Sequence, residues 1–177
     1  SMALGDFHQQ LIGLIPGWEV MPQKGGYPDL VNNERKIIVE LKARRNTVKG
    51  SDLVGVYENL LNWVNRGYEG YLGVFGYILP ASKKHLSEPK LYVPSDAKSK
   101  QRKQPDERIV EMDGYILWAL ITDSRKGIPS APYENPNALI DVWNQVWNAI
   151  GRQGSKPFDS AIELELAKIA RGSIGLK

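Results

Sequence analysis

Two acidic residues and one lysine stand at a suggestive spacing: Asp29, then, after ten further residues, Glu40 and Lys42. Side chains alternate along a strand, so Glu40 and Lys42 share one face of a strand predicted at 36–41 and its continuation. Carboxylates are hard oxygen ligands that hold Mg²⁺ and leave coordination positions open for water. Such an ion polarises a phosphoryl oxygen, while a lysine orients or deprotonates the attacking water or neutralises charge on the phosphorus. The pattern therefore predicts metal-assisted hydrolysis of a phosphodiester.

The position of Asp29 depends on the pairing of a hairpin whose turn is predicted at 32–35. In one register Asp29 lies opposite Ile38 and diagonal to Glu40, and in a second register it faces Glu40 directly. Both registers place the two carboxylates within roughly 5–8 Å at the backbone. A shift by one residue would instead turn Asp29 to the opposite face of the sheet.

A surface ion pair is the alternative interpretation of these residues. Pro-Asp is a common turn dipeptide, and Glu-x-Lys occurs often on exposed strands. Here, however, the preceding residues Ile37, Ile38 and Val39 are apolar on both faces of the strand. This context favours a functional site over a solvated face.

The same residues resemble a known signature. Pro28-Asp29 followed by Glu40-Leu41-Lys42 is similar to the motif of the PD-(D/E)XK nucleases. Asn46-Thr47 and the predicted helical segment Tyr57-Glu58-Asn59-Leu60 extend the resemblance to type II restriction endonucleases, within a subgroup that cuts short palindromes of the GGNCC or GGWCC type. The resemblance covers residues 26–60 and implies a mixed β-sheet flanked by α-helices.

Carried over by position, the resemblance implies that Asp29 and Glu40 are metal ligands, the Leu41 carbonyl is a third ligand and Lys42 is the catalytic lysine. It implies an endonuclease that depends on Mg²⁺, with Mn²⁺ as a substitute, and no organic cofactor. The substrate would be double-stranded DNA, and a palindromic site calls for a symmetric homodimer. Related nucleases often carry a further acid on the helix before the hairpin, where this chain offers Asp6.

Basic residues surround the motif and recur further along the chain. Residues 35–49 hold six basic residues and one acidic residue, and residues 81–108 hold eight basic residues and four acidic ones. Basic groups beside a nuclease site contact phosphates. The predicted DNA contacts are Arg44, Arg45, Asn46, Thr47, Lys49, Lys83, Lys84, Lys100, Arg102 and Lys103. Alternatively, Asn46 and Thr47 only form the turn into the next helix, and residues 95–108 are a flexible basic loop that stays solvated.

The elements that must position the motif are those of an α/β domain. A hairpin followed by a helix and a buried strand indicates a mixed sheet with a crossover helix. Apolar periodicity predicts helices at 4–15, 51–67, 113–122, 135–150 and 159–170. Extended segments are predicted at 18–21, 28–31, 36–41, 71–79 and 90–93.

The composition limits the remaining classes of protein. The 177 residues, 42% of them apolar, describe one globular domain over 1–177 and exclude intrinsic disorder; the resemblance implies that this domain is nuclease-like. The net charge of +3 is too small to indicate nucleic-acid binding by itself. The absence of cysteine excludes disulfides, thiolate-bound zinc and a cysteine nucleophile, and fits the cytoplasm. No apolar run approaches the ~20 residues of a membrane span, no export signal is evident, and Ser1-Met2-Ala3 is interpreted as a cloning remnant.

The sequence thus predicts a restriction-type DNA endonuclease. Two alternatives remain at this point: a repair, recombination or phage-associated nuclease of the same fold, and a DNA-binding module with impaired catalysis. The first alternative changes the form of DNA that is cut. The second removes the metal-dependent reaction but keeps salt-sensitive binding.

Overall fold

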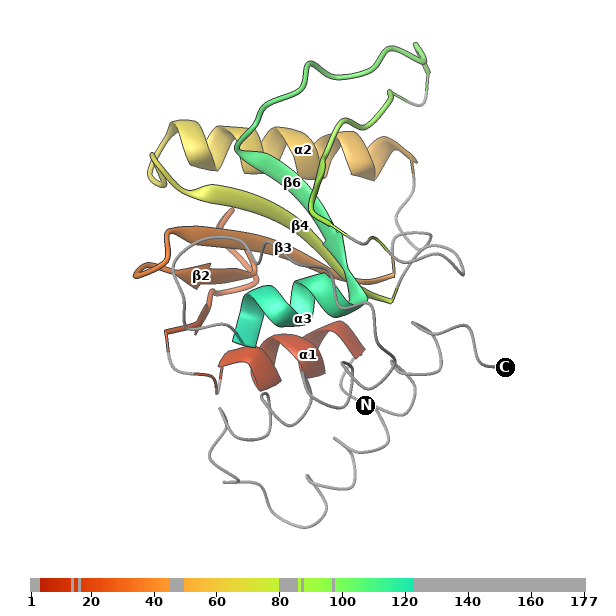
Figure 1. Cartoon of the computed structure of the whole chain (residues 1–177). Coiled ribbons are helices and arrows are strands. Elements are labelled where there is room, and N and C mark those ends of the chain that lie inside the picture. Colours follow the sequence, from red (N-terminus) through yellow and green to blue (C-terminus); the bar gives the residue numbers. More distant parts are fainter. Residues whose placement is uncertain are drawn as a thin grey trace, which may run out of the picture.

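The computed structural model of the chain holds a six-stranded mixed β-sheet with helices on both faces (Figure 1). It describes residues 4–13, 15, 17–44, 50–79, 86, 88–96 and 98–122. Its elements are α1 (Leu4–Gly13), β1 (Glu19–Val20), β2 (Leu30–Asn32), β3 (Ile37–Arg44), α2 (Gly50–Asn65), β4 (Leu72–Leu79), β5 (Lys90–Leu91), β6 (Ile109–Asp113) and α3 (Gly114–Thr122). The helices predicted at 135–150 and 159–170 lie outside the described residues.

The sheet combines a meander with a parallel centre. Its strand order is β1-β2-β3-β4-β6-β5. The first three strands pair antiparallel, β3, β4 and β6 run parallel, and β5 returns antiparallel at the far edge. The parallel pair β3 and β4 is joined through α2, as parallel strands require a crossover. This confirms the predicted α/β fold with a mixed sheet flanked by helices.

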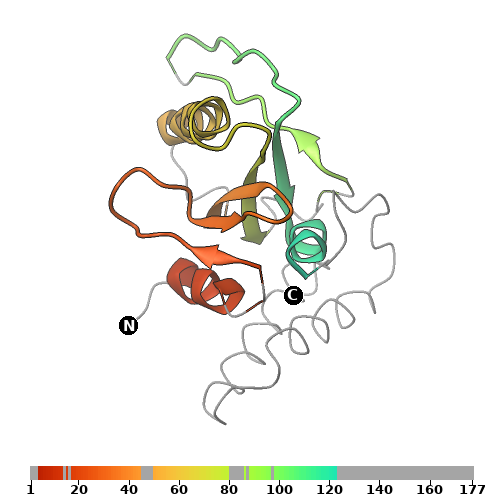
Figure 2. The ribbon, with the colours of Figure 1, turned by 90° about the vertical axis from the view of Figure 1, so that its left-hand side faces the viewer.

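Alternating side chains divide the core into two layers. Ile37, Val39 and Leu41 of β3 belong to the cluster that packs under α1 and α3. Ile38 belongs to the cluster under α2, on the opposite face of the sheet. Figures 1 and 2 show α2 on one side of the sheet and α1 with α3 on the other. Because Glu40 and Lys42 alternate with Leu41, they share one face of β3, as predicted, and this face lies beneath α2.

Strand β4 is buried on both faces, as its nearly continuous apolar sequence predicts. Val74 and Ile78 pack in one layer of the core, and Phe75 and Tyr77 pack in the other. At Gly76 a Cβ atom would lie only 2.8 Å from Cδ1 of Leu117 in α3. Glycine at this position therefore lets α3 approach the backbone of the central strand.

Strand β6 was not predicted from the sequence. It occupies a central position between β4 and β5, and the buried carboxylates of Glu111 and Asp113 interrupt its apolar pattern. Both acids have polar partners: the Tyr77 hydroxyl lies 3.4 Å from Oε2 of Glu111, and the Leu86 amide donates to Oδ1 of Asp113 at 2.9 Å. Helix α3 follows at once, beginning one residue later than predicted.

Two side chains tie the end of α3 to the meander. The indole of Trp18 donates to the carbonyl of Ile121 at 2.8 Å, and the guanidinium of Arg35 donates to the carbonyl of Leu120. Carbonyls in the last turn of a helix have no partner within the helix. The two bonds supply partners for such carbonyls, and the bond from Arg35 fixes the hairpin turn to α3 beneath the sheet. Across the described helices, none is long and apolar enough to cross a bilayer.

Candidate active site

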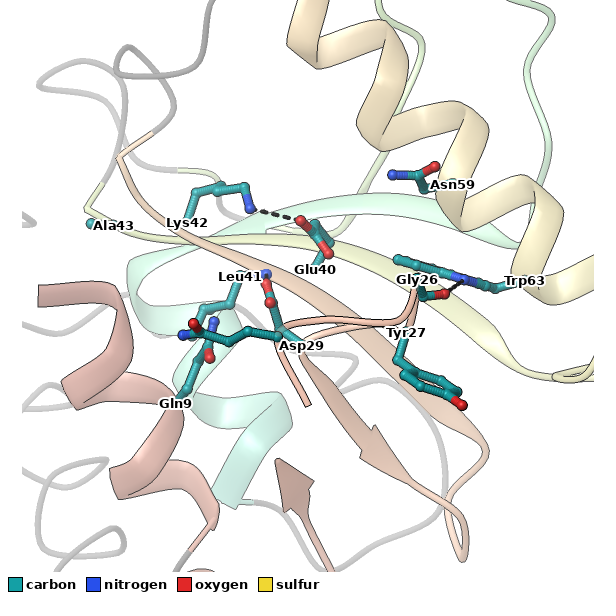
Figure 3. Close-up of a pocket in the computed structure, with 11 residues that line it drawn as sticks. Gln9, Gly26, Tyr27, Asp29, Glu40, Leu41, Lys42, Ala43, Asn59 and Trp63 are labelled. Carbon is teal, nitrogen blue, oxygen red and sulfur yellow. Dashed lines mark hydrogen bonds and ion pairs between the residues drawn. The ribbon is translucent and has the colours of Figure 1, made fainter. Parts of the chain in front are cut away.

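A pocket of about 450 Å³ opens between the end of β3, helix α2 and the loop that joins β1 to β2 (Figure 3). This volume lies within the range of ligand sites, about 300–1,000 Å³. Its lining residues are Gln9, Gln23, Gly26, Tyr27, Asp29, Glu40, Leu41, Lys42, Ala43, Asn59 and Trp63. The two acids and the lysine that the sequence singled out thus share one pocket.

The hairpin register brings Asp29 to Glu40. Leu30 pairs with Val39 and Val31 pairs with Ile38, so the continuation of the ladder sets Asp29 opposite Glu40. Of the two registers considered from the sequence, this is the one in which the acids face each other directly. Oδ2 of Asp29 also accepts a hydrogen bond from the Leu41 amide at 2.7 Å. The carboxylate is therefore held against β3 at a defined place.

Glu40 and Lys42 form an ion pair on the face of β3 beneath α2. The Nζ of Lys42 donates to Oε1 of Glu40 at 2.6 Å. The Glu40 side chain is 14% exposed and the Lys42 side chain 35% exposed. Figure 3 shows the lysine reaching along the strand toward the carboxylate. Partial burial strengthens this pair relative to one in open solvent.

The surroundings shift the proton affinities of both groups. Burial raises the pKa of the Glu40 carboxyl, and the negative charge of Asp29 raises it further, against the opposing effect of Lys42. Burial would lower the pKa of Lys42, but the carboxylates of Glu40 and Asp29 outweigh it and raise that pKa above its usual value. Lys42 therefore carries a positive charge at neutral pH.

The pocket suits a divalent cation by the chemistry of its donors. Two carboxylates face a single ammonium. Burial raises the pKa of Glu40, the negative charge of Asp29 raises it further, and a cation would offset that charge. Within the described ranges, no group of three or more His, Cys, Asp or Glu side chains is placed to hold a metal ion. Mg²⁺ is commonly bound through one or two carboxylates and several waters. Asp29 and Glu40 would supply the carboxylates for that mode of binding.

The Leu41 carbonyl is a further oxygen beside the acids. The N–H and C=O of one residue in a strand point the same way, and the Leu41 amide points to Asp29. Continuing the register places Pro28 opposite Leu41. Proline has no N–H to donate. The β2 side of the ladder therefore supplies no backbone donor to this carbonyl.

The loop between β1 and β2 forms one wall of the pocket and is fixed to α2. The indole of Trp63 donates to the carbonyl of Gly26 at 2.8 Å. Gly25 and Gly26 adopt φ values of 126° and 71°, which L-residues rarely adopt. The ring of Tyr27 packs over Gly25, where a Cβ atom would lie 2.8 Å from Cε2 of Tyr27. The glycine pair therefore allows the tight backbone geometry of this loop.

Seven lining residues were not predicted as site residues: Gln9 of α1, Gln23, Gly26 and Tyr27 of the loop, Ala43 of β3, and Asn59 and Trp63 of α2. Asn59 and Trp63 are four residues apart, so they lie on the same face of the helix. The spacing of Asn59 and Trp63 is visible in the sequence, but the apolar stripe of α2 does not show that their face borders a pocket. Gln9 is nearly buried and brings an amide, not an acid, from α1 to the pocket.

Among the other predicted site residues, those with described side chains are Lys100, Arg102 and Lys103, and they do not line the pocket. Asp6 lies within α1 and Arg44 at the end of β3, and only the backbone of each is described. The exposed Lys100 and Arg102 and the half-buried Lys103 lie in the segment after β5. The predicted residues outside the described part of the chain are Arg45, Asn46, Thr47, Lys49, Lys83 and Lys84.

The basic segment 95–108 contacts α2 through specific bonds. The Nζ of Lys103 pairs with Oε1 of Glu58 at 2.6 Å, and the hydroxyl of Tyr57 donates to the carbonyl of Gln104. Oδ1 of Asp96 accepts the amides of Lys98 and Ser99 and forms a turn at the tip. Figure 2 shows this loop beyond α2, on the side away from the sheet. Its flexibility and its contacts to DNA stay predictions.

Comparison with known proteins identifies a family and a relative of this chain. The model of the Eco47II restriction endonuclease family matches residues 1–142. The chain is 32% identical over 155 residues to the type II restriction enzyme Eco47II of Escherichia coli. This match covers 85% of the chain but 62% of that enzyme, so the chain spans less than two thirds of its relative. No solved structure matches the chain significantly.

The family match includes the whole hairpin with the acid pair, the helix α2 and all strands of the sheet. It also extends beyond the segment 26–60 that carried the resemblance in the sequence. The chain therefore belongs to the Eco47II restriction endonuclease family.

Proposed function

We propose that this protein is a Mg²⁺-dependent endonuclease of the type II restriction class, which hydrolyses phosphodiester bonds in double-stranded DNA. The observation that carries the proposal is the convergence of Asp29, Glu40 and Lys42 in one pocket. Family membership supports the same activity. We place the protein in the cytoplasm, in keeping with a chain free of cysteine and with DNA as the substrate.

Asp29, Glu40 and the Leu41 carbonyl would hold the metal ion, Mg²⁺ or in its place Mn²⁺. When bound, the ion would supply Lewis-acid polarisation of the phosphoryl oxygen and a more acidic water. The hydrogen bond from the Leu41 amide keeps Asp29 in place before any ion arrives. Two ligands thus come from one hairpin, whose register fixes their separation.

Lys42 would act through its charge. The neighbouring carboxylates raise its pKa, so the ammonium form is favoured. An ammonium beside the scissile phosphate stabilises the negative charge that builds up on the phosphoryl oxygens. It also orients Glu40 through their ion pair. We therefore assign Lys42 to charge stabilisation and not to deprotonation of the attacking water.

The DNA would be contacted by the basic residues Arg44, Arg45, Lys49, Lys83, Lys84, Lys100, Arg102 and Lys103 and by the polar residues Asn46 and Thr47. A palindromic recognition sequence has two-fold symmetry, so two copies of the chain would cut the two strands. We therefore propose a homodimer on double-stranded DNA.

Incubation of the protein with supercoiled plasmid and MgCl₂ tests this function. We expect discrete fragments, no cleavage in EDTA, and loss of cleavage in Asp29→Ala, Glu40→Ala and Lys42→Ala. The matched controls Glu69→Gln and Lys24→Ala change exposed residues outside the pocket and should cleave normally. A smear or loss from DNA ends would instead favour a repair or recombination nuclease. Full cleavage by both acid variants would exclude this site.

A further inference from the structure

We propose that Asn59 of α2 holds the DNA backbone beside the cleavage centre by donating its side-chain amide to a phosphate oxygen. This inference rests on the proposed nuclease function. Asn59 is exposed and lines the same pocket as Glu40 and Lys42. Figure 3 shows it projecting from α2 on the side of the pocket opposite the loop that carries Asp29.

The hydrogen-bonding capacity of Asn59 is available to a ligand. Within the described part of the chain, its side chain makes no hydrogen bond or ion pair. The amide offers two N–H donors and a carbonyl acceptor. Phosphate accepts from such donors without a change of protonation. The side chain therefore matches a backbone phosphate by its chemistry.

The charges around Asn59 favour a contact with the backbone over one with a base. Asp29 and Glu40 repel a phosphate, and Lys42 already shares its charge with Glu40. The amide of Asn59 is neutral, so its N–H groups attract a phosphate oxygen from the opposite wall of the pocket without adding a group that titrates. The scissile phosphate must lie beside the acids, so the nearest group on the DNA is backbone. Contacts of this kind position a duplex but do not read its sequence.

Helix α2 is rigid enough to place this donor accurately. The Trp63 indole, one turn after Asn59, is bonded to the Gly26 carbonyl at 2.8 Å. The hydroxyl of Tyr92 on the sheet side donates to the Leu53 carbonyl at 2.7 Å. Sites on well-packed helices hold their geometry better than sites on loops.

The test compares Asn59→Ala with Asn62→Ala. Both asparagines are exposed on α2, but Asn62 does not line the pocket. Alanine favours the helix more than asparagine does, so neither change should unfold α2. Plasmid cleavage with MgCl₂ should show KM raised roughly 10- to 100-fold in Asn59→Ala, as expected for one hydrogen bond to a charged group. Asn62→Ala should keep the wild-type KM.

A second pair of variants separates a phosphate contact from a structural role. Lysine binds phosphate as a point charge. Asn59→Lys should therefore recover the affinity for plasmid DNA that Asn59→Ala loses. The slope of log affinity against log salt should steepen by about one relative to the wild type. Asn62→Lys should leave affinity and slope close to the wild-type values.

The outcomes are distinguishable. Cleavage by the wild type with equal KM in Asn59→Ala and Asn62→Ala would overturn the role of Asn59 and leave the nuclease function standing. A changed set of plasmid fragments in Asn59→Ala would show base contact and overturn the backbone assignment. Failure of the wild-type protein to cleave any plasmid would remove the proposed function and this inference together.

Discussion

At the scale of single residues, the site holds excess negative charge. Asp29 and Glu40 lie opposite each other, and Lys42 alone of the three carries a positive charge. The raised pKa of Glu40 reflects this imbalance together with burial. A bound cation would offset this charge, and without one the acid pair would repel the phosphates of DNA.

This imbalance predicts opposite effects of Glu40→Gln on binding and on cleavage. The change removes one negative charge that faces the phosphate, so affinity for duplex DNA in EDTA should rise several-fold. Plasmid cleavage in MgCl₂ should fall at least about 100-fold, because one of the acids is lost. Gel-shift titration and single-turnover cleavage measure the two effects. Glu69→Gln is the control, and normal cleavage by Glu40→Gln would contradict the assignment.

The residue pattern alone predicted that Glu40 and Lys42 share a face, because side chains alternate along any strand. It did not decide between two positions of Asp29, since turns of different length satisfy the same apolar pattern. The structure closes the turn over residues 33–36. Lys36 there adopts a φ of 55°, and Oδ1 of Asn32 accepts the Arg35 amide at 2.9 Å. Neither feature has a strong sequence signal.

At the scale of secondary-structure elements, two buried indoles make comparable bonds in different places. Trp63 joins α2 to the loop before Asp29, and Trp18 joins the meander to the end of α3. Both donate to a carbonyl at 2.8 Å. Only the first of these bonds lies beside the acid pair.

We expect Trp63→Phe and Trp18→Phe to lower stability by similar amounts and to differ in activity. Each loses one hydrogen bond, which contributes about 0.5–1.5 kcal/mol to the free energy of unfolding. Trp63→Phe frees the loop that leads to Asp29, so kcat should fall roughly tenfold or more, because misplaced groups lose effective concentration. Trp18→Phe should keep the wild-type kcat. Urea unfolding and plasmid cleavage measure both, and equal kcat values would refute the positioning role.

The packing of α3 on β4 gives a prediction about stability. Gly76→Ala places a Cβ atom 2.8 Å and 3.1 Å from the two methyl carbons of Leu117, which is fully buried. Overpacking of a filled core should destabilise the fold by about 1–3 kcal/mol. Gly55→Ala, in α2 with open space around the new methyl group, should stabilise it by about 0.5–1 kcal/mol. Thermal melts that rank the two variants in the reverse order would contradict this packing.

The elements differ in how far the sequence could predict them. Helix α2 follows from apolar residues at helical spacing, and β4 from its long apolar run. Strand β6 was missed because Glu111 and Asp113 look like surface residues until Tyr77 and the Leu86 amide are brought beside them. The walls of the pocket were missed for the same reason. Gln9 and Asn59 meet the acids through tertiary packing, which no local pattern encodes.

At the scale of the whole molecule, a palindromic target predicts assembly. One chain carries one acid pair among the described residues of its pocket, and cutting both strands takes two such sites. Light scattering should therefore give twice the mass of one chain, either free or on a cleavable duplex. A single chain bound to DNA that cuts both strands in one binding event would contradict the homodimer.

The bond between the Asp29 carboxylate and the Leu41 amide has a consequence for dynamics. Pro28 has no N–H to donate to the Leu41 carbonyl, and the Asp29 side chain accepts the Leu41 amide with its own oxygen. The Leu41 proton should therefore exchange slowly with deuterated solvent, although it lies past the last paired residue of β2. Because Asp29, the proposed metal ligand, also accepts this amide proton, the proton is a label-free reporter of the acid pair. Its exchange rate should respond when Asp29 is neutralised or drawn toward an ion.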